Sequence, residues 1–354
     1  MIVIPLENFF LMLKGLMVMN SSKDYEFIVD KDSEIRLDKF LVKSFSRIGI
    51  DVTRSKIEKL LDANLVFISS GKAAKANLVC KQGWVIKLNL SLELSSEDNL
   101  SSKNILAEDL PFDIVYEDAD ILVVNKTANF VVHPGAGNKT GTLLNAVKYY
   151  LINSGKIKNP NLPARLGLVH RLDKDTTGLI LFAKSQDCLL KLNQQFLDRS
   201  INKQYLALVY LPKRGANILR ENDHGIIETT IGRDPKNRLK MMANVGTKLA
   251  KTQWSVIERL YQAALVQIIL HTGRTHQIRV HMSSIGCPIM QDALYGDLNN
   301  KLEAKVKKIV EQAGHQLLHA WKLTFSHPKT NKTISLEAPI PVEFTAVVEN
   351  LRNV

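Results

Sequence analysis

Short apolar runs of the kind that form β-strands recur along the chain from residue 112 onward. They are Phe112–Tyr116, Ile121–Asn125, Leu179–Ala183, Tyr205–Tyr210 and Leu265–Leu270. Apolar residues at helical spacing lie between and after them, at 187–196 and 301–312. The first two runs are separated by four residues, so they can pair as a hairpin before any helix intervenes. The pattern therefore predicts an α+β fold rather than a strict alternation of strands and helices.

A basic segment precedes these runs. From residue 36 to residue 90 there are 11 Lys and Arg against 4 Asp and Glu. Apolar residues recur three and four positions apart over 36–45 and 55–61, which predicts two amphipathic helices, the second capped by Thr53. Strand-like runs follow at 65–68 and 84–88. This small ααβ unit, in a chain of formal net charge +12, favours an anionic partner, either a nucleic acid or an anionic lipid surface.

The remaining segments give the domain boundaries. We expect residues 1–30 to be an N-terminal extension and not a secretory signal, because Pro5, Glu7 and Lys14 interrupt its apolar run. Residues 91–110, with five acidic residues and one Lys, are expected to link a small domain at 31–90 to a large one at 111–354. Three cysteines without a CxxC pair, and no long apolar run, favour a cytoplasmic protein without a membrane span.

The sequence GLVHRLDKDTTG, residues 167–178, ends where the apolar run 179–183 begins. An Asp in a loop directly before a buried strand is held by rigid backbone, and catalytic carboxylates are commonly placed there. Asp173 is therefore a candidate nucleophile or base, and a nearby guanidinium favours the charged form of such a group. The alternative is a plain turn in which Asp173 pairs with Arg171 or Lys174.

Histidines and arginines gather in LHTGRTHQIRVHMSSIG, residues 270–286. We expect residues 274–284 to be a helix, with His276 and Arg279 on one face and Arg274 on another. The alternative is a helix that only positions phosphate groups. The three His of this stretch are five residues apart, which suits no known zinc spacing, and the later HQLLH lacks the Glu of HExxH. No metal site is expected.

A third polar group stands at the start of the run 201–209. Lys203, Tyr205, Ala207 and Val209 alternate onto one face of the expected strand, with the polar pair first. Tyr205 is a candidate for stacking on a base, and the alternative is a core Tyr with a satisfied hydroxyl.

These three stretches, in this order, resemble the RluA family of pseudouridine synthases, of the type that modifies large-subunit ribosomal RNA. Residues 31–90 resemble the S4 RNA-binding domain. The likeness implies a mixed, mainly antiparallel sheet flanked by helices in the large domain. Two segments depart from the family pattern. The usual Asn-Lys-Pro-Ala-Gly reads NKTAN at 125–129, and the usual Gly-Asp before a Tyr-Gly turn reads Gln291-Asp292.

The resemblance also implies roles for residues. Asp173 matches the catalytic aspartate, Tyr205 the tyrosine that stacks on the target base or exchanges a proton with it, and Arg279 the arginine paired with the aspartate. Arg274 is the alternative for that pairing, and Arg171 matches the residue that enters the space left by the flipped nucleotide. The other expected RNA contacts are His170, Lys203, Arg274 and His276 in the large domain and Arg36, Lys39, Arg54 and Lys56 in the small one.

The implied function is isomerisation of specific uridines of large-subunit (23S) ribosomal RNA, by a monomer that needs no cofactor, no membrane and no obligatory protein partner. One alternative is an RNA-binding assembly factor that has lost this activity, although such a protein need not keep Asp173, Tyr205 and Arg279 together. A second is a hydrolase that uses Asp173 and Asp175 as a carboxylate pair. Residues two apart would point to opposite faces of an extended segment, which speaks against this second alternative.

Overall fold

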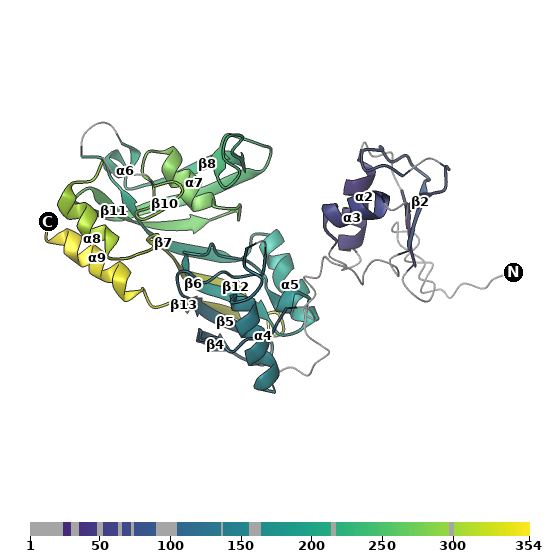
Figure 1. Cartoon of the computed structure of the whole chain (residues 1–354), viewed down its shortest axis with the longest axis horizontal. Helices are drawn as coiled ribbons and strands as arrows, with labels where there is room; N and C mark the ends of the chain where they lie inside the picture. Colours follow the sequence, from purple (N-terminus) through teal and green to yellow (C-terminus); the bar gives the residue numbers. More distant parts are fainter. Residues whose placement is uncertain are drawn as a thin grey trace. The chain divides into compact units, whose positions relative to one another are not determined.

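The computed structural model describes residues 24–29, 35–47, 52–62, 66–71, 74–89, 105–135, 137–155, 164–213, 217–296 and 301–354. They form two compact units, one within residues 1–99 and one within residues 100–354 (Figure 1). Most of the expected N-terminal extension and residues 91–104 of the expected linker lie outside the described residues. None of the helices in the described ranges has the length and apolar character that a membrane crossing requires.

The small unit is a pair of helices packed on a three-stranded antiparallel sheet. Its elements are β1 (Asp24–Ile28), α2 (Leu37–Arg47), α3 (Arg54–Asp62), β2 (Val66–Ile68) and β3 (Val85–Asn89), with the strands in the order β1–β3–β2. The core takes the apolar stripe of each helix, including Leu41 and Phe45 of α2 and Ile57 and Leu61 of α3. Both helices and the two later strands therefore lie where the sequence predicts them.

Strand β1 corrects the predicted boundary at residue 31. Residues 24–28 pair with β3 along their whole length, and Phe27 and Val29 are buried in the core of the small unit. The alternation of apolar and charged residues in this segment is too short to predict a strand. The segment was therefore predicted to belong to the N-terminal extension. Pairing with β3, about sixty residues further along the chain, makes it a strand.

The large unit is built on one ten-stranded sheet. The strand order is β4 (Asp113–Glu117), β5 (Ile121–Lys126), β6 (Thr177–Ala183), β12 (Leu318–Ser326), β7 (Asn202–Tyr210), β11 (Ala263–Leu270), β10 (Leu249–Leu260), β8 (His224–Arg233) and β9 (Met241–Ala243), with β13 (Thr333–Glu337) also paired to β12. All neighbours are antiparallel except β6 and β12, which are parallel. The predicted α+β class and the five predicted strand runs are confirmed.

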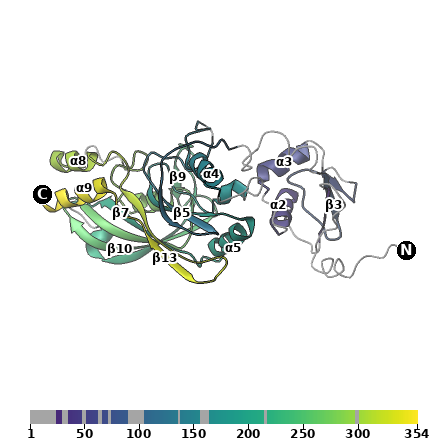
Figure 2. The ribbon, with the colours of Figure 1, turned by 90° about the horizontal axis from the view of Figure 1, so that it is seen from below.

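Helices cover both faces of this sheet. On one face lie α4 (Leu143–Asn153) and α7 (Gln277–Ser284), packed on Tyr205, Ala207 and Val209 of β7 and their neighbours. On the other lie α5 (Gln186–Leu197), α8 (Ala304–Glu311) and α9 (Val342–Arg352). Figure 2 shows α8 and α9 together at one end of the sheet and α5 at the other. The short helices η1 (Ala164–Gly167) and α6 (Ile218–Glu221) lie in connections.

The expected linker is wrong at its C-terminal end. The buried Nζ of Lys148 donates to the carbonyl of Ile105, and Nδ2 of Asn145 donates to the carbonyl of Leu106. Ile105 itself is buried in the core of the large unit. Residues 105–110 therefore belong to the large unit, because polar side chains of α4 bind their backbone.

Candidate active site

The loop that carries Asp173 is fixed at its C-terminal end by β6 and β12. The hydroxyl of Thr176 accepts a hydrogen bond from Nε2 of Gln316 at 2.6 Å, and the hydroxyl of Thr177 lies 2.8 Å from Nδ1 of His319. A turn closes the loop, since the Thr176 N–H donates to the carbonyl of Asp173. The carboxylate of Asp173 is thus carried on backbone that both parallel strands hold in place.

A buried lysine holds the same loop from inside. Nζ of Lys126, at the end of β5, donates to the carbonyls of Thr127, Phe130 and Lys174. Its side chain is almost completely buried, and burial lowers the pKa of its ammonium group to about 7 although Asp175 and Asp173 act in the opposite direction. Nothing in the sequence pattern had suggested a role for Lys126.

Asp173, Arg279 and Asp292 form a continuous ion-pair chain. Nη1 of Arg279 donates to Oδ2 of Asp173 at 2.8 Å, while Nε and Nη2 donate to the two oxygens of Asp292 at 2.7 and 2.8 Å. Asp292 is fully buried. Burial acts against the charged form of Arg279, but its bonds to Asp292 and Asp173 outweigh this and raise the pKa of the guanidinium. Arg279, and not Arg274, is therefore the partner of Asp173, as the resemblance implied.

The helix expected at 274–284 begins later, at Gln277. His276 precedes it in the left-handed backbone region, with φ of 55°. As a result Arg274 lies outside the helix, and its Nε donates to the carbonyl of Leu249 at 3.0 Å. Its backbone N–H donates to Oε1 of Gln277. The left-handed turn at His276 is what separates Arg274 from the Asp173 side of the helix.

His276 and Tyr295 stand beside the ion-pair chain. Nε2 of His276 is 3.9 Å from Oδ2 of Asp173, and its Nδ1 is 2.8 Å from the hydroxyl of Tyr295. The Tyr295 ring also lies against the guanidinium of Arg279, with Cζ 5.1 Å from the ring centroid. Burial lowers the pKa of His276, which Arg279 and Arg171 also lower and Asp173 and Asp292 raise.

Tyr205 lies on the face of the sheet that α4 and α7 cover. It belongs to β7, opposite Ile268 of β11 and Ala320 of β12, and only 7% of its surface is exposed. Burial, and then the charge of Asp173, raise the pKa of its hydroxyl, so the phenol is neutral. Asp173, Tyr205 and Arg279 are therefore gathered at one place on the α4 and α7 face of the sheet.

His170, predicted to contact RNA, makes contacts within the protein. Its Nε2 accepts the N–H of Leu181 at 3.1 Å, and its ring stacks on Phe196 of α5 with centroids 5.1 Å apart. Burial, with a smaller effect of Lys203, lowers the pKa of His170 to about 3. Lys203 is half-buried, with Nζ 5.2 Å from the Phe196 centroid, whereas Arg171 is exposed. His170 is thus a packing residue that caps a strand N–H, a role its position in the motif does not reveal.

In the small unit a buried acid arranges the predicted basic residues. Asp38 is fully buried, and its carboxylate accepts from Arg36 at 3.1 Å and from Nε of Arg54 at 2.7 Å. Lys39 is exposed and Lys56 half-buried, and the Lys56 N–H donates to the hydroxyl of Thr53, which is the predicted helix cap. Four cationic side chains thus come from the start of α2 and the start of α3.

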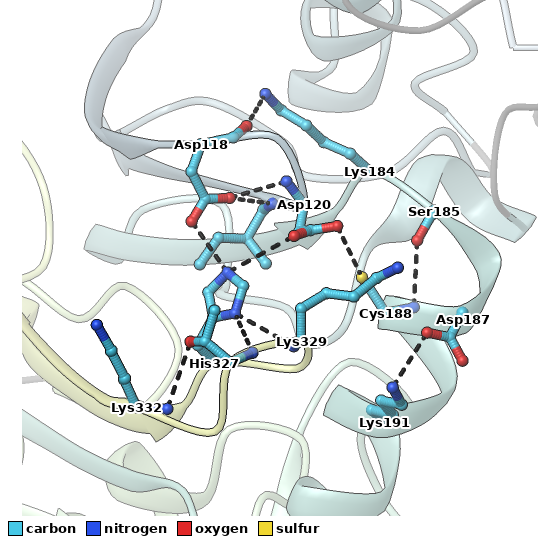
Figure 3. Close-up of polar contacts among 12 residues, drawn as sticks. Asp118, Asp120, Lys184, Ser185, Asp187, Cys188, Lys191, His327, Lys329 and Lys332 are labelled. Atoms are coloured by element: carbon cyan, nitrogen blue, oxygen red, sulfur yellow. Dashed lines mark hydrogen bonds and ion pairs between the residues drawn. The ribbon is translucent and has the colours of Figure 1, made fainter.

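Asp118, Asp120 and His327 come close enough together to suggest a cation site (Figure 3). Their hydrogen bonds argue otherwise. Nδ1 of His327 accepts the N–H groups of Lys329 and Thr330, so Nε2 carries the proton and donates to Oδ2 of Asp118 at 3.0 Å. Oδ1 of Asp118 accepts the N–H groups of Asp120 and Ile121. These atoms join the β4–β5 turn to the β12–β13 turn.

Three residues of the site were missed by sequence reasoning: Lys126, Asp292 and Tyr295. All three lie in the two segments that depart from the family pattern. Both departures take left-handed backbone, Asn129 with φ of 59° and Gln291 with φ of 60°, so they keep the turns that glycine would make. The turn between β8 and β9 was also missed, although Arg233, Lys236, Arg238 and Lys240 make it strongly basic.

Comparisons with known proteins agree on one family. The family model for RNA pseudouridylate synthases matches residues 120–284. The uncharacterized RNA pseudouridine synthase YlyB of Bacillus subtilis is 36% identical over 90% of this chain and 94% of its own length. The ribosomal large subunit pseudouridine synthase D of Vibrio vulnificus is 35% identical over 91% of this chain and 93% of its own. The structure of human RNA pseudouridylate synthase domain containing 4 covers 68% of this chain and 93% of its own, at 25% identity and a TM-score of 0.53.

Proposed function

The chain belongs to the RNA pseudouridine synthase family, and we propose that it converts specific uridines of large-subunit (23S) ribosomal RNA to pseudouridine without a cofactor. The observation that carries the proposal is the carboxylate of Asp173, fixed by Arg279 at 2.8 Å on a loop that two strands and a buried lysine hold. The name of the Vibrio vulnificus relative supports large-subunit RNA as the substrate. Such an enzyme would work in the cytoplasm, as a monomer.

The reaction is an isomerisation, so no atoms are gained or lost overall. The bond between N1 of uracil and C1′ of ribose breaks, the base turns, and C5 bonds to C1′. C5 loses its proton and N1 gains one. Asp173 serves as the nucleophile at C1′ or as the base that generates a glycal-like intermediate, and the geometry is compatible with both.

Tyr205 and Arg171 have complementary parts in this proposal. The neutral, largely buried phenol of Tyr205 offers a stacking surface for the detached base and a hydroxyl for proton exchange. Arg171 is exposed next to the catalytic loop, so its side chain is free to enter the stack when the uridine leaves it. Flipping costs a few kcal/mol, which contacts of this kind offset.

RNA binding would be shared between the two units. The small unit presents Arg36, Lys39, Arg54 and Lys56, in keeping with the S4-like reading of its sequence. Such residues bind phosphate without reading sequence, whereas the pocket around Asp173 selects one base.

Two observations weigh against the alternatives. An assembly factor without activity has no need of the ion-pair chain from Asp173 to the buried Asp292. A carboxylate-pair hydrolase needs both acids at the substrate, but Oδ1 of Asp175 is buried and finds no hydrogen-bond partner among the described residues.

The test is pseudouridine mapping on a large-subunit RNA fragment incubated with wild-type protein or Asp173→Asn, with no cofactor added. We expect new pseudouridine with the wild type only. Assembled large subunits and transfer RNA are the next substrates if the fragment stays unmodified. Binding without modification on all three would favour the assembly factor, and equal activity of Asp173→Asn would exclude the mechanism.

A further inference from the structure

Tyr295 and His276 form a hydrogen-bonded pair that the proposed reaction leaves without a role. The Tyr295 hydroxyl accepts the N–H of Met241, on the edge strand β9, at 2.7 Å. The same oxygen lies 2.8 Å from Nδ1 of His276, and the two rings meet edge to face with centroids 5.6 Å apart. The pair therefore links an edge strand to the histidine beside Asp173.

The position of the proton on His276 follows from its neighbours. The Tyr295 oxygen accepts a hydrogen bond from the N–H of Met241, so the hydroxyl proton can be donated to Nδ1 of His276. The opposite arrangement, with the proton on Nδ1, would turn the lone pair of Nε2 towards the Asp173 carboxylate, 3.9 Å away. A lone pair facing an anion is unfavourable, whereas an N–H facing it is attractive. Nε2 is therefore the protonated nitrogen.

This arrangement makes the two oxygens of Asp173 unequal. Nη1 of Arg279 and Nε2 of His276 both approach Oδ2. Among the described residues no hydrogen bond reaches Oδ1. Oδ2 is thus the oxygen that the protein holds, and Oδ1 is the one left to meet C1′ of the substrate.

The geometry points to Tyr295 as a positioning residue that fixes the tautomer of His276, so that the Nε2–H, together with Arg279, reserves Oδ2 of Asp173 and leaves Oδ1 to react. The inference rests on the proposed function in one respect, that Asp173 is the reacting carboxylate. The left-handed backbone of His276, at φ of 55°, fits this role, because strained backbone at a non-glycine residue is kept where the side chain must point in one direction.

The first experiment removes the hydroxyl alone. Tyr295→Phe keeps the ring against Arg279 but cannot donate to His276. We expect kcat at saturating RNA to fall roughly tenfold, the value of one hydrogen bond, with KM nearly unchanged. Tyr261→Phe is the control, since it also loses a hydroxyl that donates one hydrogen bond, to Glu303, on an exposed residue. The Tyr295 hydroxyl accepts the Met241 N–H as well, so the thermal stability of both variants is compared.

A merely structural tyrosine would not give the next two signatures. In Tyr295→Phe the imidazole regains the Nε2–H when it is protonated, so the activity ratio of variant to wild type should rise as the pH falls from 8 to 5.5. His276→Gln supplies an amide N–H that needs no tyrosine. In that background Tyr295→Phe should cost less than about twofold in kcat, a clear departure from additivity.

Nitrogen NMR of the His276 imidazole tests the tautomer without any substrate. The wild type should show a proton on Nε2 and none on Nδ1, and Tyr295→Phe a mixture. If this holds while the wild type modifies no RNA, the proposed function fails, and only the assignment of the His276 tautomer to Tyr295 stands. A proton on Nδ1 in the wild type overturns the inference. So does a Tyr295→Phe defect that is independent of pH, additive with His276→Gln and matched by a loss of thermal stability.

Discussion

Arg279 is held at both ends of its guanidinium group. The carboxylate of Asp292 accepts hydrogen bonds from Nε and Nη2, so Nη1 is the nitrogen that donates to Asp173. Because Asp292 is fully buried, removing its charge would leave a buried cation with half of its partners. The orientation of the Asp173 carboxylate, the proposed catalytic group, thus depends on the buried Asp292 acting through Arg279.

Lys126 makes stability depend on pH. Its pKa falls from 10.5 to about 7 on folding, because burial favours the neutral amine. Between these values the unfolded chain binds a proton that the folded chain does not, so the contribution of Lys126 to stability increases as the pH rises. It is greatest above pH 10.5 and is lost as the pH falls through about 7.

The comparison of wild type with Lys126→Met isolates this effect. Between pH 7 and 9 the free energy of unfolding of the wild type should rise relative to that of Lys126→Met. The rise should be at most about 1.4 kcal/mol per pH unit. Urea unfolding at each pH measures it, with Lys191→Met on α5, an exposed lysine, as control. A difference that stays constant over this range would contradict the low pKa.

At the scale of elements, Gly178 lets β6 and β12 meet. The two strands pair in parallel over only two residue pairs, His319 with Thr177 and Ala320 with Gly178. Gly178 has φ of 108°, and a Cβ there would lie 2.2 Å from the carbonyl oxygen of Ala320. The glycine is therefore required by both its backbone and its surroundings.

Gly178→Ala should destabilise the large unit by about 3 kcal/mol or more, because backbone must move apart to admit the methyl group. It should also reduce activity by displacing the loop that ends at Thr177. Thermal unfolding and the mapping assay measure the two effects. Gly135→Ala is the control, since a Cβ placed there would have no atom within 4 Å among the described residues beyond its chain neighbours. Equal melting temperatures for the two variants would refute the argument.

The basic turn between β8 and β9 is held by hydrogen bonds of its own. Oδ1 of Asp234 accepts the N–H groups of Lys236 and Asn237, and Nη1 of Arg233 donates to the carbonyl of Arg238. The turn is thus shaped by its own side chains, and Lys236 and Arg238 remain exposed. Preformed cationic turns suit phosphate binding, since little order is lost when the RNA binds.

We expect the double variant Lys236→Ala, Arg238→Ala to bind substrate RNA more weakly. The slope of log binding constant against log salt concentration should become shallower by about 0.7 for each phosphate group that the turn no longer neutralises. The rate at saturating RNA should change little. Filter binding at several salt concentrations measures the slope. The control variant Lys305→Ala, Lys308→Ala removes the same charge from α8, on the opposite face of the sheet. An equal loss of affinity in both would show a nonspecific charge effect.

At the scale of the whole molecule, the small unit and the large unit each have their own core. Arg36 and Arg54 of the small unit are held by Asp38 within that unit. A change to the basic residues of the small unit should therefore affect binding and not the chemistry at Asp173.

The variant Lys39→Ala, Lys56→Ala, which leaves both arginine partners of Asp38 in place, should raise KM for a long ribosomal RNA fragment, with kcat unchanged. The effect should shrink on a stem-loop too short to reach both units, because the small unit then adds nothing to binding. Steady-state kinetics on the two RNAs measures this. A fall in kcat as large as the rise in KM would contradict a role confined to binding.

Local periodicity and local chemistry are visible in the amino-acid sequence without a structure. The helices α2 and α3, the strands β4, β5, β6, β7 and β11, and the loop that places Asp173 before β6 all follow from residue spacing within a short window. A motif of charged residues ahead of an apolar run is likewise visible without a structure.

Which side chains meet depends on contacts between segments that are distant in the chain. Asp173 and Arg279 are 106 residues apart in the chain, and Lys126 reaches the carbonyl of Lys174 across 48. β1 is a strand because β3 pairs with it. The His170 ring packs inside the protein because its Nε2 accepts the N–H of Leu181 and its face stacks on Phe196. Spacing within a segment fixes which face a residue takes, but the partner on that face comes from a distant segment, so its identity emerges only when the sheet is assembled.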